Sequence, residues 1–300
     1  MTRIGFLACE TTLPGSPDRC GSERRGDAYE HDLTIAALEP AFAARGLALE
    51  VIDWEAPIER FAGLGAVLLG TAWNYQDKPE AFLARLEALD AMGIAVCNPP
   101  ETVRWNIAKT YLKVLADAGA ATIPTLWSDR LDAASARAAF TAFDCERLVV
   151  KQQVGAGALG QELLEAGALA DDWRFDRPAM VQPFLPGIAT EGELSFIFID
   201  GEASHAVRKL PAKGDYRIQS LYGGREEMHE PGADELDAAR AVMAALPLVT
   251  PLYARIDMLR MANGSLAVME AELIEPYLYP EQGPELGDRL ARGIAKRCKT

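Results

Sequence analysis

Short apolar runs alternate with amphipathic segments through the first hundred residues. The apolar runs, which predict strands, cover residues 3–8, 47–54, 65–73 and 94–98. The amphipathic segments, which predict helices, cover residues 32–46 and 78–93, and each ends at a glycine. Alternating strands and helices build a parallel sheet, because each helix returns the chain to the same sheet edge. We therefore expect an α/β domain with a Rossmann-like parallel sheet over residues 1–105.

Two polar loops follow strands of this expected sheet. They cover residues 9–28 and 71–77. Parallel sheets bind ligands beyond the carboxyl ends of their strands, so both loops belong to the edge where a ligand would bind. Their length also indicates function, since long structureless loops are uncommon inside compact domains. The sequence assigns no specific role to either loop.

The prolines Pro99 and Pro100 mark a boundary, because paired prolines interrupt a helix or a central strand. Beyond them, helices are expected over residues 106–119 and 131–143, and strands over residues 147–151 and 179–185. Two β-hairpins are expected over residues 193–210 and 253–273, with turns at Asp200-Gly201 and Asn263-Gly264. This order predicts a small lid subdomain over residues 106–185 and an α+β subdomain with an antiparallel sheet over residues 186–300.

The overall charge of the chain limits its partners. Among 300 residues, 30 are basic and 44 are acidic, which gives a formal net charge of -14. Such a chain repels nucleic acid and anionic membranes unless basic residues are locally concentrated, and the sequence has no basic run. Neither a signal-peptide core nor the ~20 apolar residues of a membrane span occurs. The five cysteines are widely spaced and lack a C-x-x-C pair, which predicts reduced thiols and a cytoplasmic protein.

The glycines Gly155, Gly157 and Gly160 spell the pattern G-x-G-x-x-G after a predicted strand. A dinucleotide fingerprint needs its first glycine directly after the strand and a helix that opens at the third. Here three polar residues beginning at Lys151 intervene, and no further alternation of strands and helices follows. A Walker loop is excluded, because no glycine precedes Lys-Ser or Lys-Thr at the required spacing. A flexible turn is the alternative, but a lysine at the end of a buried strand favours a phosphate-binding flap.

Isolated charges occur in otherwise apolar segments further along the chain. Lys109 lies in a predicted helix and Lys151 ends a predicted strand. Asp257, Glu270 and Glu272 interrupt the last predicted hairpin, and the two glutamates project from the same face of a strand. Adjacent carboxylates repel one another, and a magnesium ion that bridges them to phosphate oxygens would relieve this repulsion. The alternative is a solvated outer face, which the apolar neighbours on both strands disfavour.

Together these features resemble the ATP-grasp ligases, in particular those with a glutathione-synthetase-like nucleotide domain. The resemblance rests on the order of two lysines, a glycine-rich loop, the strand "VQPFL" and an Asp followed by Glu-x-Glu. It covers residues 98–300, and the first hundred residues look like the preceding substrate domain of the same superfamily. The stretches "NPPETVRWNIAKTYL", "GELSFIFIDGEASHAVRK" and "MEAELIEPYLYP" are similar to the bacterial group that contains the cycloserine-biosynthesis cyclo-ligase, which closes O-ureido-D-serine into a ring.

The resemblance implies a role for each matching residue. It implies that the residues around the nucleotide are Lys109, Lys151, Gly155, Gly157, Gly160, Gln182, Pro183, Phe184 and Glu193 or Glu191. Of these, the lysines and glycines would bind the phosphates. The residues Gln182, Pro183 and Phe184 in the strand "VQPFL" would bind adenine, and the glutamate would bind the ribose. The implied magnesium ligands are Asp257, Glu270 and Glu272. The family often has Asn at the last of these positions, so Glu272 adds a negative charge that should tighten metal binding.

The resemblance also implies a chemistry. A substrate carboxylate attacks the γ-phosphate of ATP, and a nitrogen nucleophile opens the resulting acyl phosphate, with release of ADP and phosphate. Phosphoryl transfer depends mainly on positioning and charge neutralisation, so we expect ATP and Mg²⁺ as cofactors and Lys209, Arg217 and Arg255 as catalytic cations. The expected substrate is a small amino-acid-like carboxylate, and the nitrogen belongs to the same molecule or to a second one.

Two other functions fit parts of the sequence. One is an ATP-binding regulatory module without catalysis, and the other is an NAD(P)-dependent oxidoreductase that uses the glycine pattern. The lysines and carboxylates favour the ligase, because neither alternative needs all of them. The sequence leaves the oligomeric state open, and a homo-oligomer is compatible with it.

Overall fold

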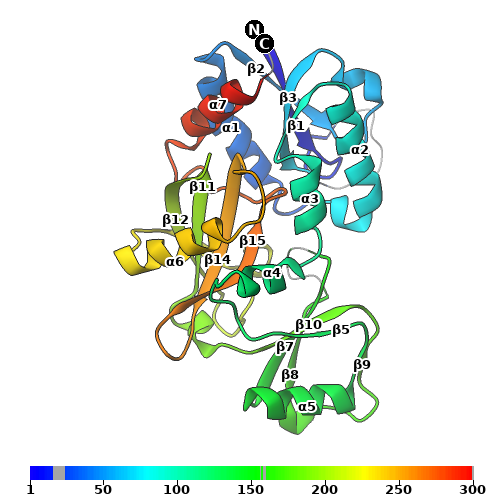
Figure 1. Ribbon diagram of the computed structural model, residues 1–300, viewed down its shortest axis with the longest axis vertical. Helices are drawn as coiled ribbons and strands as arrows, with labels where there is room; N and C mark the ends of the chain where they lie inside the picture. Colours follow the sequence, from blue (N-terminus) through cyan, green and yellow to red (C-terminus); the bar gives the residue numbers. More distant parts are fainter. Residues whose placement is uncertain (16–23, 156, 158–159, 299–300) are drawn as a thin grey trace.

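The computed structural model describes residues 1–15, 24–155, 157 and 160–298, and its elements form three parts along the long axis (Figure 1). The first part is a four-stranded parallel sheet in the order β2-β1-β3-β4. Its strands are β1 (Thr2–Ala8), β2 (Leu47–Asp53), β3 (Leu64–Thr71) and β4 (Ala95–Cys97). The helices α1 (Tyr29–Ala43) and α2 (Pro79–Ala91) connect them. The expected Rossmann-like sheet is therefore confirmed.

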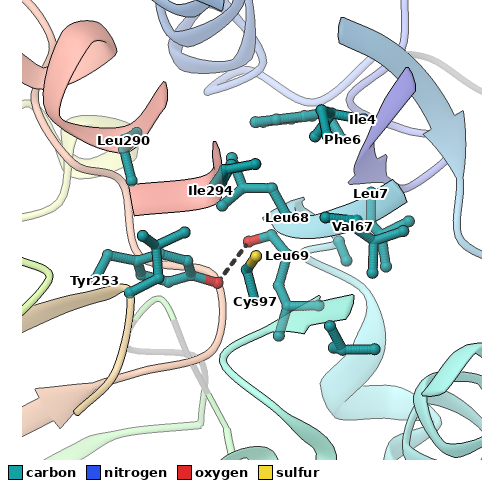
Figure 2. Packing of buried hydrophobic residues seen from close by; sticks show 14 of the residues in the cluster. Ile4, Phe6, Leu7, Val67, Leu68, Leu69, Cys97, Tyr253, Leu290 and Ile294 are labelled. Carbon is teal, nitrogen blue, oxygen red and sulfur yellow. Dashed lines mark hydrogen bonds between the residues drawn. The ribbon is translucent and has the colours of Figure 1, made fainter. Parts of the chain in front are cut away.

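A helix from the far end of the chain completes this first part. α7 (Leu286–Arg297) lies beside α1 and inserts Leu290 and Ile294 into the core of the parallel sheet (Figures 1 and 2). Gly287 permits the close approach, because a Cβ atom there would lie 2.4 Å from the carbonyl oxygen of Ala37. The sequence analysis does not predict this helix.

The second part is a four-stranded antiparallel sheet in the order β5-β10-β7-β8. Its strands are β5 (Leu126–Ser128), β7 (Arg147–Gln152), β8 (Glu162–Glu165) and β10 (Ala179–Pro183). The helix α5 (Ala133–Phe143) packs on it, and the two-residue strands β6 (Leu131–Asp132) and β9 (Arg174–Phe175) pair at its side. α5 begins as its sequence suggests, since the Asp132 carboxylate accepts a hydrogen bond from the Ser135 amide at 2.8 Å.

The glycine pattern lies in the loop between β7 and β8. These two strands are antiparallel neighbours, so the loop is a hairpin connection. The sequence analysis does not predict β8. A dinucleotide fingerprint requires a helix directly after its glycines, and a strand stands there instead. The oxidoreductase alternative therefore loses its structural basis.

The third part is a five-stranded antiparallel sheet in the order β13-β12-β11-β14-β15. Its strands are β11 (Glu193–Ile199), β12 (Glu202–Leu210), β13 (Arg225–His229), β14 (Tyr253–Arg260) and β15 (Leu266–Glu272). Both expected hairpins are present, and Asp200, Gly201 and Gly264 at their turns have positive φ angles of 54°, 83° and 86°. The helix α6 (Ala233–Ala244), which the sequence analysis also misses, contributes Ala239 and Val242 to the core behind this sheet. Within the described residues, no helix is long and apolar enough to cross a bilayer.

The prediction of one continuous helix over residues 106–119 is wrong, because two shorter helices cover this part of the chain. A helix begins earlier than expected, because Pro100 opens α3 (Pro100–Asn106) at a position where a missing amide hydrogen has no cost. The chain then leaves helical geometry, since the Lys109 amide donates to the Gln153 carbonyl at 2.8 Å, and a separate helix α4 (Tyr111–Asp117) follows. Lys109 therefore lies in a turn between two helices. α4 packs on the five-stranded sheet, and the boundaries 106–185 and 186–300 stay a prediction.

Asn98 joins the first part to the third. It is 1% exposed, follows β4 in the left-handed conformation (φ 56°), and donates from Nδ2 to the carbonyl oxygens of Tyr253 (2.8 Å) and Leu273 (2.7 Å). Its Oδ1 accepts from the Leu252 amide at 2.7 Å. Asn98→Ala should therefore lower the free energy of unfolding by about 3 kcal/mol, because three buried backbone groups lose their partner. Chemical denaturation measures this loss, and Asn263→Ala in an exposed turn is the control. An equal effect of both variants would contradict this role.

Candidate active site

A cavity of about 260 Å³ lies where the three parts meet. Most of the predicted site residues line it, although they come from distant segments of the chain. Those that line it are Lys109, Lys151, Gly155, Gly157, Gln182, Pro183, Phe184, Glu193, Lys209, Arg217, Arg255, Asp257, Glu270 and Glu272. Gly160 and Glu191 are not among the residues that line it. The sequence analysis therefore gathers residues that the fold brings to one place.

Glu191 and Glu193 differ in their surroundings because the chain bends between them. Gly192 has a positive φ of 83°, so the regular alternation of β11 begins only after it. Glu191 forms an ion pair with Arg260 at 2.5 Å, whereas Glu193 is 1% exposed and lines the cavity. Of the two residues expected at the ribose, Glu193 is the one that the structure places beside the cavity.

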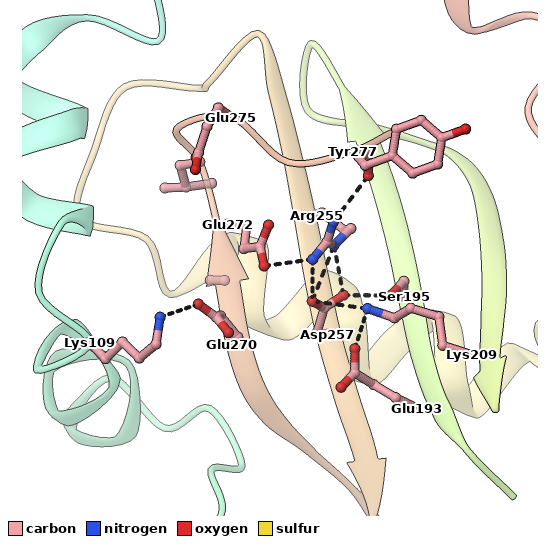
Figure 3. Close-up of polar contacts among 12 residues, drawn as sticks. Lys109, Glu193, Ser195, Lys209, Arg255, Asp257, Glu270, Glu272, Glu275 and Tyr277 are labelled. Carbon is pink, nitrogen blue, oxygen red and sulfur yellow. Dashed lines mark hydrogen bonds and ion pairs between the residues drawn. The ribbon is translucent and has the colours of Figure 1, made fainter. Parts of the chain in front are cut away.

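Charged residues cover one face of the five-stranded sheet at alternating positions (Figure 3). The strand register puts Glu193 opposite Lys209, Ser195 opposite Asp257, Asp257 opposite Glu270, and Arg255 opposite Glu272. Side chains directly across an antiparallel pair interact, and like charges there are destabilising. The Asp257 and Glu270 carboxylates therefore need cations close by.

Two buried cations hold the centre of this face. Arg255 Nη2 lies 2.9 Å from Asp257 Oδ2 and 2.6 Å from Glu272 Oε1 (Figure 3). Lys209 Nζ forms an ion pair with Glu193 and lies 3.3 Å from Asp257 Oδ2. Although burial acts against it, these cations lower the pKa of Asp257 below its ordinary value. Asp257 is therefore ionised throughout the neutral range.

The outer carboxylates of this face are less well neutralised. Burial raises the pKa of Glu272 to about 7, and the neighbouring Glu270 adds to this effect against the pull of Arg255. Glu270 forms an ion pair with Lys109, whose Nζ also donates to the Gly155 carbonyl at 2.8 Å. Lys109 thus ties the first glycine of the flap to the floor of the cavity. A further cation at this edge would lower the free energy of the cluster.

Lys151 is the cation in the cavity that the described structure leaves without a partner. It lines the cavity from the end of β7, and among the described residues its ammonium group forms no hydrogen bond and no ion pair. Burial lowers the pKa of its ammonium group. A buried cation is costly unless an anion neutralises it, so this position favours an anionic ligand.

Part of the cavity wall is apolar. Ile123, Ile188 and Leu259 form a small core cluster with Phe184 packed against it, and all four line the cavity. The Phe184 amide already donates to the Arg147 carbonyl at 2.9 Å, and the Arg147 guanidinium lies 4.0 Å from the centre of the Phe184 ring. Of the backbone groups expected to bind adenine, this amide is therefore occupied. An apolar slot beside a charged floor suits a ligand with a flat ring at one end and negative charge at the other.

The carboxylates fit magnesium by donor type and charge. Asp257, Glu270 and Glu272 offer hard oxygen donors around one cavity. In the described residues, however, no three His, Cys, Asp or Glu side chains are gathered at metal-binding distance. Arg255 and Lys109 hold these carboxylates instead. Metal binding at this position therefore requires the carboxylates to turn away from their cations.

Several residues that line the cavity are absent from the sequence-based set. Arg25, Asp27, Trp73 and Gln76 come from the two long loops of the first part, and Glu275 comes from the segment after β15. The length of the two loops and their place at the carboxyl edge of the sheet predicted that they lie at the site. No sequence pattern indicated the role of each residue within them. Residues 16–23 of the first loop, which include Cys20, lie outside the described residues.

Two family models match this chain. Residues 4–98 match the model described as D-cycloserine synthetase DcsG, N-terminal domain, and residues 164–264 match prokaryotic glutathione synthetase, ATP-grasp domain. The cycloserine biosynthesis protein DcsG of Streptomyces lavendulae is 28% identical over 286 residues, which are 89% of this chain and 95% of that protein. The crystal structure of D-cycloserine synthetase DcsG superposes with a TM-score of 0.80 and 25% identity, over 99% of this chain and 100% of that one. The chain has the ATP-grasp fold and is similar to ATP-grasp ligases along its whole length.

Other ATP-grasp ligases share parts of these similarities. The glutathione synthetase of Prochlorococcus marinus (strain MIT 9313) is 32% identical over 206 residues, which are 62% of each chain. The D-alanine–D-alanine ligase of Bacillus anthracis has the same fold, with a TM-score of 0.69 and 17% identity over 99% of this chain and 97% of that one. The predicted ATP-grasp fold and the prediction of an ADP-forming ligase are confirmed.

Proposed function

We propose that this ATP-grasp ligase activates a small amino-acid-like carboxylate as an acyl phosphate and joins it to a nitrogen, within one molecule or between two. Lys151 carries this proposal, because its ammonium group has no partner among the described residues and offers a phosphate-binding cation within a cavity that is otherwise rich in acids. The cavity volume of about 260 Å³ favours a small acid over a large one. The similarity to D-cycloserine synthetase DcsG along the whole chain supports the cyclising form.

The nucleotide would lie between the lid and the sheet. Lys151 and Lys109 would contact its phosphates, and the glycine-rich hairpin would close over them. The apolar slot formed by Ile123, Ile188, Leu259 and Phe184 would hold adenine. Glu193 would bind the ribose. Asp257, Glu270 and Glu272 would hold Mg²⁺, which when bound supplies charge neutralisation for the phosphate oxygens.

Arg255 suits the reacting end of the substrate. Its guanidinium has five N–H groups, and among the described residues it donates to Asp257, Glu272 and the Tyr277 carbonyl, the last from Nη1 at 3.1 Å. Within the described structure, one N–H of Nη1 is left to stabilise an oxygen on which negative charge develops. Lys209 holds Asp257 and Glu193 in place. Arg217 lies at the edge of the cavity, paired with Asp215 at 2.7 Å, where it would meet a substrate carboxylate.

The reaction has two steps under this proposal. A substrate carboxylate oxygen forms a bond to the γ-phosphorus, and the bond to the bridging oxygen breaks with its electron pair leaving on ADP. A nitrogen lone pair then attacks the acyl carbon, the carbon–oxygen bond to phosphate breaks, and the nitrogen loses a proton. The Lys151 and Arg255 cations stabilise the charge that develops in each step.

An ADP-release screen with isotope labelling tests the proposal. The screen offers MgATP with O-ureido-D-serine, D- and L-serine and D-alanine, each with and without added ammonium. With an oxygen-18-labelled carboxylate on the active acid, the label should appear in the released phosphate. Its absence, or formation of AMP, would contradict the acyl phosphate. ATP binding without turnover of any acid would favour the regulatory module, and tighter binding of NADH than of MgATP would favour the oxidoreductase.

The magnesium assignment makes a separate prediction. Glu270→Gln and Glu272→Gln should each raise the half-saturating Mg²⁺ concentration about tenfold, because each removes a charged oxygen ligand. Magnesium titrations of ADP release measure the shift, with the exposed Glu202→Gln as the control. Titration curves of both variants that overlay the parent would remove these residues from the metal site.

A further inference from the structure

Glu275 differs from the other carboxylates on the floor of the cavity. It is 8% exposed and lines the cavity from the segment just after β15. Glu193, Asp257, Glu270 and Glu272 each form an ion pair with a lysine or arginine. Among the described residues, the Glu275 carboxylate forms no ion pair and accepts a hydrogen bond only from its own backbone amide. In Figure 3, no dashed line joins Glu275 to the other residues drawn. A buried carboxylate without a cation or a side-chain donor is rare in proteins and calls for an explanation.

The first part of the fold holds Glu275 in this position. Trp73 Nε1 donates to the Glu275 carbonyl oxygen at 3.1 Å, which fixes the backbone of Glu275 against the loop after β3. The same loop contributes Gln76, which also lines the cavity. Its Oε1 is buried and has no hydrogen-bond partner among the described residues. Within the described part of the chain, two separate segments therefore bring oxygen acceptors without a side-chain donor to this cavity.

The chemistry of these acceptors selects their ligand. A phosphate or a carboxylate would be repelled by a carboxylate, whereas a nitrogen with N–H groups would satisfy both oxygens. The groups that act on Glu275 from the surrounding elements are Glu272 on β15, Arg255 on β14, Lys109 between α3 and α4, and Tyr75 on the loop. Arg255 and Lys109 are both already paired with other carboxylates. Their attraction does not offset burial and the neighbouring Glu272, which together raise the pKa of Glu275 to about 8.

We propose that Glu275 accepts the proton of the attacking nitrogen and that Gln76 Oε1 accepts a second N–H of the same nitrogen. This inference rests on the proposed function. As the nitrogen forms its bond to the acyl carbon and phosphate leaves with the electron pair of the breaking carbon–oxygen bond, the N–H proton passes to the Glu275 carboxylate. The carboxylic acid then returns the proton to phosphate or water. Glu275 is thus the general base of the second step and takes no part in the first.

Glu275→Gln separates the two steps. Glutamine keeps the size and a hydrogen-bond acceptor but takes no proton. Hydroxylamine is the probe for the first step, because it is an unprotonated nucleophile at neutral pH and captures an acyl phosphate as a hydroxamate without a base. The acid is O-ureido-D-serine or, if the parent does not turn it over, the amino acid that gives the largest ADP release in the screen. The exposed Glu281→Gln is the matched control.

The expected result is selective. Glu275→Gln should form the ligation product about 100-fold more slowly than the parent, while hydroxamate formation, MgATP affinity and the thermal transition stay within threefold. Glu275→Asp, which keeps a carboxylate, should recover part of the loss and provides a second variant. Equal loss of product and hydroxamate, or unchanged product formation, would overturn the role of Glu275. If the parent itself yields no hydroxamate with any acid, the acyl phosphate fails, and this inference fails with it.

Discussion

Replacing Lys209 by methionine should lower the free energy of unfolding by about 3–5 kcal/mol. Lys209 is 4% exposed, and Glu193 and Asp257, the two carboxylates that it pairs with, are each 1% exposed. Methionine fills similar space but leaves Glu193 as a buried anion without its cation. Breaking a buried pair from one side costs more than the pair itself contributes, because the remaining charge cannot return to water.

The pH dependence of this loss identifies its cause. Without Lys209, the pKa of Glu193, which burial already raises to about 7, rises further above that of the unfolded chain. A group with a raised folded-state pKa destabilises the fold when it is ionised, so the penalty is present at high pH and falls as protonation neutralises the carboxyl. The difference in free energy of unfolding between Lys209→Met and the parent should therefore be larger near pH 8 than near pH 5.

The control is a lysine in an exposed ion pair. Lys78 lies 2.7 Å from Glu55, with side-chain exposures of 49% and 37%. Lys78→Met should change the free energy of unfolding by less than about 1 kcal/mol, because water screens such pairs. Comparable losses for the two variants, or a loss for Lys209→Met that does not depend on pH, would refute the buried-charge account.

Lys151→Ala should lower kcat/KM for ATP by about 100- to 1000-fold without loss of stability. Its ammonium group has no hydrogen-bond or ion-pair partner among the described residues, so its removal breaks no polar contact there. Under the proposed function, its ammonium group meets the phosphates, and loss of one charge-assisted contact in the transition state accounts for an effect of this size. The stability of the variant should equal or exceed that of the parent, because a buried cation without an anion is unfavourable.

Steady-state kinetics and a thermal melt in parallel check this prediction. Lys296→Ala is the matched control, since Lys296 pairs with Asp200 at 2.6 Å on the surface and its side chain is 69% exposed. A lower melting temperature together with lost turnover would make Lys151 structural. Unchanged kcat/KM would remove it from the phosphate site.

Local patterns in the sequence predicted the floor of the active site. Glu270 and Glu272 alternate within one strand, so their shared face follows from the period of two alone. The hairpin turns followed in the same way, because Asp200-Gly201 and Asn263-Gly264 favour the left-handed backbone that tight turns need. Each of these predictions depends on residues a few positions apart.

Long-range contacts account for the elements and residues that were missed. The helix expected over residues 106–119 is interrupted because the Lys109 amide bonds to Gln153, which no local pattern reveals. Glu275 belongs to the cavity because Trp73, two hundred residues earlier, holds its carbonyl oxygen. Glu191 and Glu193 could not be separated until the bend at Gly192 was known. Such positions depend on which segments meet in space rather than on composition.

The placement of α7 has a consequence for the order of folding during synthesis. The strands of the parallel sheet precede the other two sheets in the sequence, but the Leu290 and Ile294 side chains that cover part of its core follow all of them. Domains usually fold as they emerge from the ribosome, yet this one keeps an apolar face open until α7 has been translated. The nascent chain therefore exposes apolar surface during synthesis of the two other sheets, and a helix that follows them completes the parallel sheet.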